Sequence, residues 1–204
     1  MRRTGWIAGA GLGGAAALAT AALLTLQSRA AKAPTDSASG FTLASTDISA
    51  GGRIADSQVF NGFGCKGGNV SPALSWSNPP AGTRSFALLM HDPDAPTGSG
   101  WWHWVVYNIP AGVISLPAGA GAGAGDPQKG VLPAGAVQGR TDFGAPGYGG
   151  PCPPPGRPHH YYLRLYALKV AKLDVPADAT AAYIGFMVRT QSLAKAELMG
   201  LYGR

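Results

Sequence analysis

Glycine and proline divide this chain into short segments, and that division limits the folds open to it. The 204 residues include 31 glycines and 17 prolines, the two residue types that most often end helices and form turns. Beyond residue 40, only residues 177–201 form an Ala-rich stretch suited to a helix. A fold of strands and turns is therefore expected in place of a helical bundle.

Six segments carry the β-branched, aromatic and alternating residues typical of strands: residues 41–43, 53–60, 73–76, 85–91, 101–109 and 161–170. Between residues 111 and 150 lies a long Gly/Ala/Pro-rich stretch. Only one strand and one helix are expected after it, too little for a second core, so we interpret this stretch as loops within one domain. The pattern predicts an α+β domain, mainly β, over residues 41–204, with a C-terminal helix.

The first 33 residues have the pattern of an export signal. Arg2 and Arg3 precede an uncharged run from residue 4 to residue 28, and Ala31 and Ala33 have the spacing of a cleavage site. The run is also long enough to span a bilayer, so an uncleaved N-terminal anchor is the alternative to a cleaved signal peptide. Residues 34–40 are expected to form a polar linker. The protein is accordingly predicted to be exported: periplasmic, secreted or membrane-anchored.

The positive charge of the chain is concentrated in this leader. The formal net charge is +6, but from residue 34 onward 12 basic residues face 10 acidic ones and form no basic cluster. A nucleic-acid partner is therefore not expected, and contact with a membrane is expected only through an uncleaved N-terminal segment.

The side chains capable of chemistry gather in residues 91–110 and 148–163, which contain all four histidines. Strand alternation places Trp101, His103 and Val105 on one face, and His159 and Tyr161 on one face of a second strand. If the two strands share a sheet, His103, His159 and Tyr161 converge. The turn from Asp92 to Asp94 would add carboxylates that favour protonated imidazoles, and the Gly-rich residues Tyr148, Gly149 and Gly150 could supply backbone N–H donors.

Each of these motifs also has an ordinary structural explanation. An Asp-Pro-Asp sequence forms turns, a Trp-His-Trp strand suits a core, and the Pro-rich residues 151–158 suit a rigid loop or a partner-binding polyproline segment. Their joint occurrence favours a site.

Two enzymatic alternatives remain open at this point. Aspartate, histidine and tyrosine side chains can serve as a general acid and base of a hydrolase, although Ser99 lies in only a fragment of a nucleophile elbow. Four residues could instead ligate zinc or manganese without the close spacing of known metal motifs: Asp92, Asp94, His103 and His159. No nucleophile or cofactor motif is found, so we expect a protein without enzymatic activity, metal or cofactor.

Several of these motifs, in this order, resemble the phosphatidylethanolamine-binding protein family, specifically its bacterial, Raf-kinase-inhibitor-like branch. The likeness covers about residues 41–204. The matching motifs are Asn-Val-Ser-Pro-Ala-Leu-Ser-Trp at 69–76, Asp-Pro-Asp-Ala-Pro at 92–96, Trp-His-Trp at 102–104 with Asn-Ile-Pro at 108–110, Gly-Gly-Pro-Cys-Pro-Pro at 149–154, His-x-Tyr at 159–161 and the closing residues 198–204.

The resemblance implies an antiparallel β-sandwich of a larger and a smaller sheet, with an anion pocket. Its ligand would be a phosphate-bearing small molecule or lipid head group such as phosphoethanolamine, and the protein could act by inhibiting a partner enzyme. Two positions depart from the family: His160 stands where arginine is usual, and Thr190-Gln191 stands where the branch often has Gly-His. The implied pocket residues are Asp92, Asp94, Trp101, His103, Tyr148, Gly149, Gly150, His159 and Tyr161.

A disulfide is expected between Cys65 and Cys152. They are the two cysteines of a chain predicted to enter an oxidising compartment, and both lie in loops attached to the family motifs. Two buried free thiols are the alternative.

Overall fold

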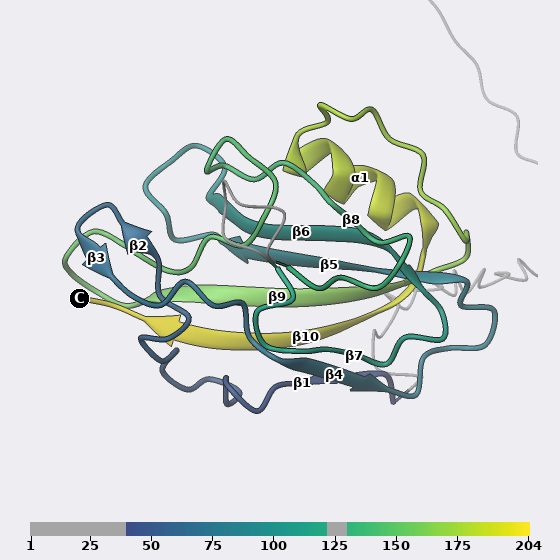
Figure 1. Cartoon of the computed structure of the whole chain (residues 1–204), viewed down its shortest axis with the longest axis horizontal. Coiled ribbons are helices and arrows are strands. Elements are labelled where there is room, and N and C mark those ends of the chain that lie inside the picture. Colours follow the sequence, from purple (N-terminus) through teal and green to yellow (C-terminus); the bar gives the residue numbers. More distant parts are fainter. Residues whose placement is uncertain (1–39, 122–129) are drawn as a thin grey trace, which may run out of the picture. The chain divides into compact units, whose positions relative to one another are not determined.

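The computed structural model describes residues 40–121 and 130–204. The predicted leader and nearly all of the linker lie outside the described residues. The domain has three layers, with a small sheet on one side of a large sheet and helix α1 (Ala181–Gln191) on the other (Figure 1). This arrangement confirms the predicted antiparallel sandwich of two unequal sheets.

Both sheets are antiparallel. In the small sheet β4 (Leu74–Ser77) lies between β1 (Thr42–Ala44) and β7 (Ser115–Leu116). The large sheet has the order β10 (Ser192–Tyr202), β9 (His159–Leu168), β5 (Ser85–Asp92), β6 (Trp101–Pro110) and β8 (Val137–Gln138). A short hairpin of β2 (Asn61–Gly62) and β3 (Cys65–Lys66) stands apart from them.

The large sheet is buried on both faces, which explains why its central strand is apolar almost throughout. On β5, Phe86, Leu88 and Met90 enter the core between the sheets, whereas Ala87 and Leu89 pack in the core beneath α1. Successive side chains of a strand point to opposite faces, so a strand covered on both faces needs apolar residues at every position.

The predicted strand over residues 53–60 is wrong. This segment makes a single bridge, from Arg53 to Leu201, and then turns, with the Gln58 and Val59 amides donating to the carbonyls of residues 55 and 56. Its apolar residues Ile54 and Val59 are buried. They anchor a loop to the core, and a buried loop residue has the same apolar character as a strand residue.

The predicted helix over residues 177–201 is too long. Helix α1 covers only Ala181–Gln191, and the next eleven residues form strand β10, paired with β9 along its length. On β10, Ala196, Leu198 and Tyr202 are buried in the core between the sheets. This two-residue period gives the strand a core face, and pairing at the edge of the sheet overrides the helix propensity of its Ala, Lys and Glu residues.

Local signals explain the bounds of α1. The Thr180 side chain accepts a hydrogen bond from the Tyr183 amide at 3.2 Å and so caps the first turn. Ile184 and Val188 share the buried face. Among the described residues, no helix combines the length and the apolar character needed to cross a bilayer.

A β-bulge interrupts β6 at His103. Met90 pairs with Trp104 and His91 pairs with Trp102, so His103 has no partner on β5. The extra residue changes the alternation: Trp104 lies in the core between the sheets and Trp102 packs on the side of α1. The predicted shared face therefore holds for Trp101 and His103, which line one pocket, and is wrong for Val105, which lies beneath α1.

Candidate functional site

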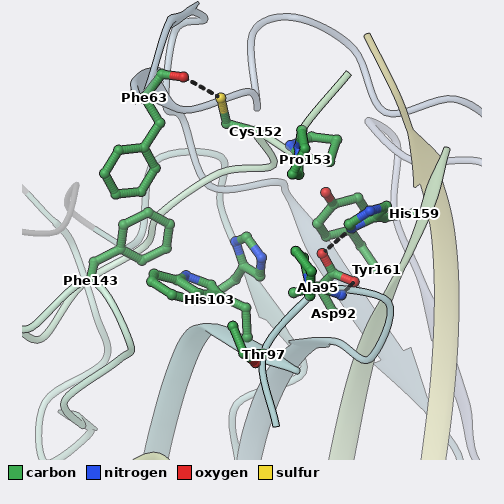
Figure 2. Close-up of a pocket in the computed structure, with 13 residues that line it drawn as sticks. Phe63, Asp92, Ala95, Thr97, His103, Phe143, Cys152, Pro153, His159 and Tyr161 are labelled. Atoms are coloured by element: carbon green, nitrogen blue, oxygen red, sulfur yellow. Dashed lines mark hydrogen bonds and ion pairs between the residues drawn. The ribbon is translucent and has the colours of Figure 1, made fainter. Parts of the chain in front are cut away.

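A pocket of about 200 Å³ opens at one end of the large sheet. There β5 ends while β6 and β9 begin, because antiparallel neighbours place the end of one strand beside the start of the next. Five of the nine predicted site residues meet in it, and loop residues complete its wall (Figure 2). The lining residues are Phe63, Asp92, Ala95, Pro96, Thr97, Trp101, His103, Phe143, Cys152, Pro153, Pro154, His159 and Tyr161.

Asp92 organises one side of the pocket. One carboxylate oxygen accepts the amides of Asp94 at 2.8 Å and Ala95 at 3.1 Å, which closes the predicted turn. The other oxygen lies 2.8 Å from His159 Nδ1. Asp92 therefore fixes both the loop after β5 and the orientation of an imidazole on β9 (Figure 2).

Asp94 lies outside the pocket, contrary to expectation. Its Oδ2 accepts from the backbone amide of His160 at 2.9 Å and lies 2.6 Å from His160 Nδ1, and its Oδ1 is 3.4 Å from Arg157. The hydrogen bonds from His160 lower the pKa of Asp94 below its usual value. Asp94 and His160 thus bind each other outside the pocket.

His103 is buried at the base of the pocket. Its Nδ1 lies 2.7 Å from the Gly149 carbonyl oxygen, and because a carbonyl can only accept, Nδ1 carries the proton. Burial lowers the pKa of His103 to about 4, outweighing the opposing effects of the Gly149 carbonyl and Asp92. The expectation of a readily protonated imidazole is therefore wrong for His103, since desolvation exceeds the attraction of the carboxylate.

Two polar atoms of the pocket residues lack a hydrogen-bond partner among the described residues: His103 Nε2 and Tyr161 Oη. Their rings meet edge to face with centroids 5.1 Å apart. Burial, followed by the nearby Asp92 carboxylate, raises the pKa of Tyr161, so its hydroxyl stays protonated. Unpaired buried polar atoms are costly and uncommon in native proteins, so these two atoms call for a partner from outside the protein, such as a water molecule or a ligand.

The Tyr148–Gly150 segment supports the pocket without lining it. The Gly149 amide donates to the His103 carbonyl and the Gly150 amide donates to Asn69 Oδ1. The Tyr148 hydroxyl donates to the Gln58 carbonyl, deep in the core. The amides of Gly149 and Gly150, two of the predicted N–H donors, are therefore already used within the protein. A Cβ on Gly149 would collide with the Phe143 ring, so glycine here allows Phe143 to pack against the segment.

Three aromatic side chains form the mouth of the pocket. Phe63 and Phe143 stack with centroids 5.9 Å apart, and Trp101 meets Phe143 edge-on at 5.5 Å. Phe63 is 64% exposed, although it is large and apolar. The sequence reasoning missed Phe63 and Phe143 because both lie in loops far from the strand motifs. Phe63 stands two residues before Cys65, and that cysteine was the available signal.

The expected disulfide between Cys65 and Cys152 is present, with the two Cα atoms 6.0 Å apart. It joins the β2–β3 hairpin, which carries Phe63 at its turn, to the Pro-rich loop that lines the pocket. The bridge therefore holds one aromatic side chain of the mouth close to the pocket wall.

The residues proposed for the enzymatic alternatives are brought together only in part. Asp92, His103, His159 and Tyr161 line the pocket, whereas Ser99 and Asp94 do not. Ser99 is exposed and outside the pocket, and its carbonyl oxygen lies 3.0 Å from His91 Nε2. Within residues 40–121 and 130–204, no three His, Cys, Asp or Glu side chains are grouped so that they could hold a metal ion. The predicted metal set is divided because Asp94 points to His160 and Arg157.

Comparison with known proteins agrees with this architecture. The sequence profile of the family described as phosphatidylethanolamine-binding protein matches residues 44–203. The chain is 51% identical to the UPF0098 protein YbcL of Escherichia coli over 166 residues, which cover 81% of this chain and 88% of YbcL. It is 46% identical to the UPF0098 protein YbhB of the same organism over 160 residues, covering 78% and 98% of the two chains.

Solved structures show the same fold. The crystal structure of E. coli YbcL, described as a member of the mammalian PEBP family, superposes with a TM-score of 0.77 and covers 81% of this chain and 99% of its own. A homologue from Chlamydia trachomatis, 32% identical, superposes with a TM-score of 0.66 over 81% of this chain and 99% of its own.

Proposed function

The chain belongs to the phosphatidylethanolamine-binding protein family, and we propose that it binds a small phosphate-bearing ligand in the pocket between β5, β6 and β9. The observation that carries this proposal is the pair of unpaired polar atoms, His103 Nε2 and Tyr161 Oη, at a pocket wall that is otherwise mainly apolar. A phosphate group has several oxygens, so it can accept from the tyrosine hydroxyl while other oxygens face the remaining polar groups.

The size of the pocket limits the ligand. A volume of about 200 Å³ lies below the roughly 300–1,000 Å³ of sites for drug-sized molecules. It suits a head group such as phosphoethanolamine and is too small for a whole lipid. The aromatic mouth formed by Phe63, Trp101 and Phe143 would contact whatever carbon chain or ring extends outward from the phosphate.

Export of the protein is part of the proposal. The disulfide between Cys65 and Cys152 favours an oxidising compartment. A relative from Mycobacterium tuberculosis, 38% identical over 141 residues that cover 63% of its own length, carries the name "Putative lipoprotein LppC". Inhibition of a partner enzyme stays a prediction, as does the absence of enzymatic activity.

Calorimetric titration tests the ligand class. Phosphoethanolamine and inorganic phosphate should bind with heat, and ethanolamine, which lacks the phosphate, should give none at the same concentration. Tyr161→Phe should weaken both phosphate ligands. The proposal fails if the unmutated protein binds neither phosphate ligand at millimolar concentration.

A further inference from the structure

The hydrogen-bonding state of His103 constrains which oxyanion can enter the pocket. Its Nδ1–H is committed to the Gly149 carbonyl at 2.7 Å, so its Nε2 offers only a lone pair to the pocket. That atom has no partner among the described residues. A fully deprotonated anion would place an acceptor oxygen against this lone pair, whereas a group carrying a proton would satisfy it.

The surroundings of His103 disfavour the alternative, in which a positively charged imidazole would bind any anion. The ring is buried between Phe143, 5.5 Å away, and Tyr161, 5.1 Å away, by ring centroids. Desolvation lowers the pKa of His103 more than its neighbours raise it. The titratable groups around the His103 ring are Asp92 and His91 on β5 and His159 and Tyr161 on β9. Asp92 favours the protonated form of His103, and His91 disfavours it. His159 is hydrogen-bonded to Asp92.

We propose that the pocket selects an oxyanion that carries a proton, a hydrogen phosphate monoester, whose P–O–H donates to His103 Nε2 while another phosphate oxygen accepts from the Tyr161 hydroxyl. This inference rests on the proposed function and narrows it. A sulfate monoester has the same shape but carries no proton near neutral pH, so it leaves Nε2 facing an acceptor oxygen. The site therefore discriminates between phosphate and sulfate esters by one proton.

Proton-linked binding follows directly. The second pKa of a phosphate monoester is about 6, so above that pH the ligand must take up about one proton to enter the pocket. Its affinity should then fall about tenfold per pH unit above roughly pH 7, and should level off below about pH 6. A sulfate monoester should show neither the proton uptake nor this slope.

Phenyl phosphate and phenyl sulfate are matched probes, because the phenyl ring suits the aromatic mouth and both esters carry about one negative charge near pH 5. Calorimetry of the unmutated protein near pH 7.5, in buffers of different ionisation enthalpy, should show uptake of about one proton with phenyl phosphate. Near pH 5 phenyl phosphate should bind at least about tenfold tighter than phenyl sulfate.

Two variants locate the proton. His103→Asn keeps a donor for the Gly149 carbonyl and removes Nε2, so both proton uptake and the preference for phosphate should be lost. His160→Asn is the control, since His160 faces Asp94 outside the pocket, and it should leave both unchanged. The measurements on the unmutated protein decide the matter even if His103→Asn fails to fold.

The outcomes separate the two proposals. Phosphate binding without proton uptake, or equal affinity for the two esters near pH 5, would overturn the inference and leave the proposed function standing. Proton uptake that persists in His103→Asn, or that accompanies phenyl sulfate, would assign the proton to another group such as His159 and overturn it as well. Binding of neither ester, nor of inorganic phosphate, would remove the proposed function and the inference together.

Discussion

His103 and Gly149 are bound to each other twice: the imidazole Nδ1–H donates to the Gly149 carbonyl at 2.7 Å, and the Gly149 amide donates to the His103 carbonyl at 2.9 Å. These two hydrogen bonds attach the bulge of β6 to the loop before the Pro-rich segment. It also fixes which imidazole nitrogen faces the pocket. Gly149, whose amide was predicted to donate to an anion, instead holds His103 in position.

Acid should weaken the fold through His103. Its pKa falls from 6.5 in the unfolded chain to about 4 in the folded one, so between these values the unfolded state binds more protons and the free energy of unfolding drops as the pH is lowered. The loss at pH 4.5 should be on the order of 2–3 kcal/mol relative to pH 7. Urea unfolding of the unmutated protein and His103→Asn at both pH values measures it, and parallel losses in the two proteins would contradict the assignment.

Tyr161→Phe should separate binding from stability. The hydroxyl is buried without a partner among the described residues, so its removal should leave the free energy of unfolding unchanged within about 0.5 kcal/mol, or raise it slightly. Affinity for phosphoethanolamine should fall about tenfold, because the ligand loses a donor. Thermal unfolding and calorimetry give the two values. A clear loss of stability with unchanged affinity would show that the hydroxyl serves only the fold.

Phe63→Ala should alter which phosphate ligands bind best. Phe63 is 64% exposed at the mouth, and Ile114, 66% exposed and outside the pocket, provides a matched control. Phe63→Ala should weaken phenyl phosphate several-fold, because apolar contact with the phenyl ring is lost, and should leave inorganic phosphate unchanged. Ile114→Ala should affect neither ligand. Equal losses for both ligands in Phe63→Ala would exclude a role in contacting the body of the ligand.

Removing the disulfide should affect both the fold and the mouth. Cys65 and Cys152 are 87 residues apart, and loss of such a bridge typically costs about 2–5 kcal/mol of unfolding free energy. The double variant Cys65→Ser/Cys152→Ser should therefore melt at a lower temperature and also bind phenyl phosphate more weakly, since the Phe63 hairpin loses its tether. Unchanged affinity for phenyl phosphate in the folded double variant would show that the β2–β3 hairpin keeps its position without the disulfide.

The two aspartates of the turn should differ in importance. Asp92 is 3% exposed and accepts from two amides and His159, so Asp92→Asn should cost about 2–4 kcal/mol. Asp94 is partly exposed and bonds to His160 and Arg157, so Asp94→Asn should cost about 1 kcal/mol or less. Urea unfolding near neutral pH compares them, and a larger loss for Asp94 would reverse the roles assigned here.

Local patterns were sufficient to predict the central strands and half of the site. Strand-type residues along 85–91 and 161–170 indicated β5 and β9. The family resemblance implied that Asp92, Trp101, His103, His159 and Tyr161 lie together, and all five line one pocket. The strand predictions succeeded because a strand covered on both faces needs apolar residues along its length, which is a property of the segment itself.

Other features depended on partners distant in the sequence. Residues 192–202 have a composition suited to a helix and became a strand because β9 offered an unpaired edge. Phe63 reached the pocket through a hairpin tethered by Cys152. The composition of a segment does not determine which strand edge or loop will pack beside that segment, so these features could not be predicted from local residues.

The sequence by itself determined the fold class, the paired cysteines and the residue types that meet at the end of the large sheet. Only the tertiary structure decided their chemical state: that His103 is neutral with Nε2 toward the pocket, that the Gly149 and Gly150 amides are already used, and that Asp94 faces outward. The reason is physical. A residue type sets which groups can donate, accept or ionise, but burial and the positions of neighbouring groups set which of those options has the lowest free energy.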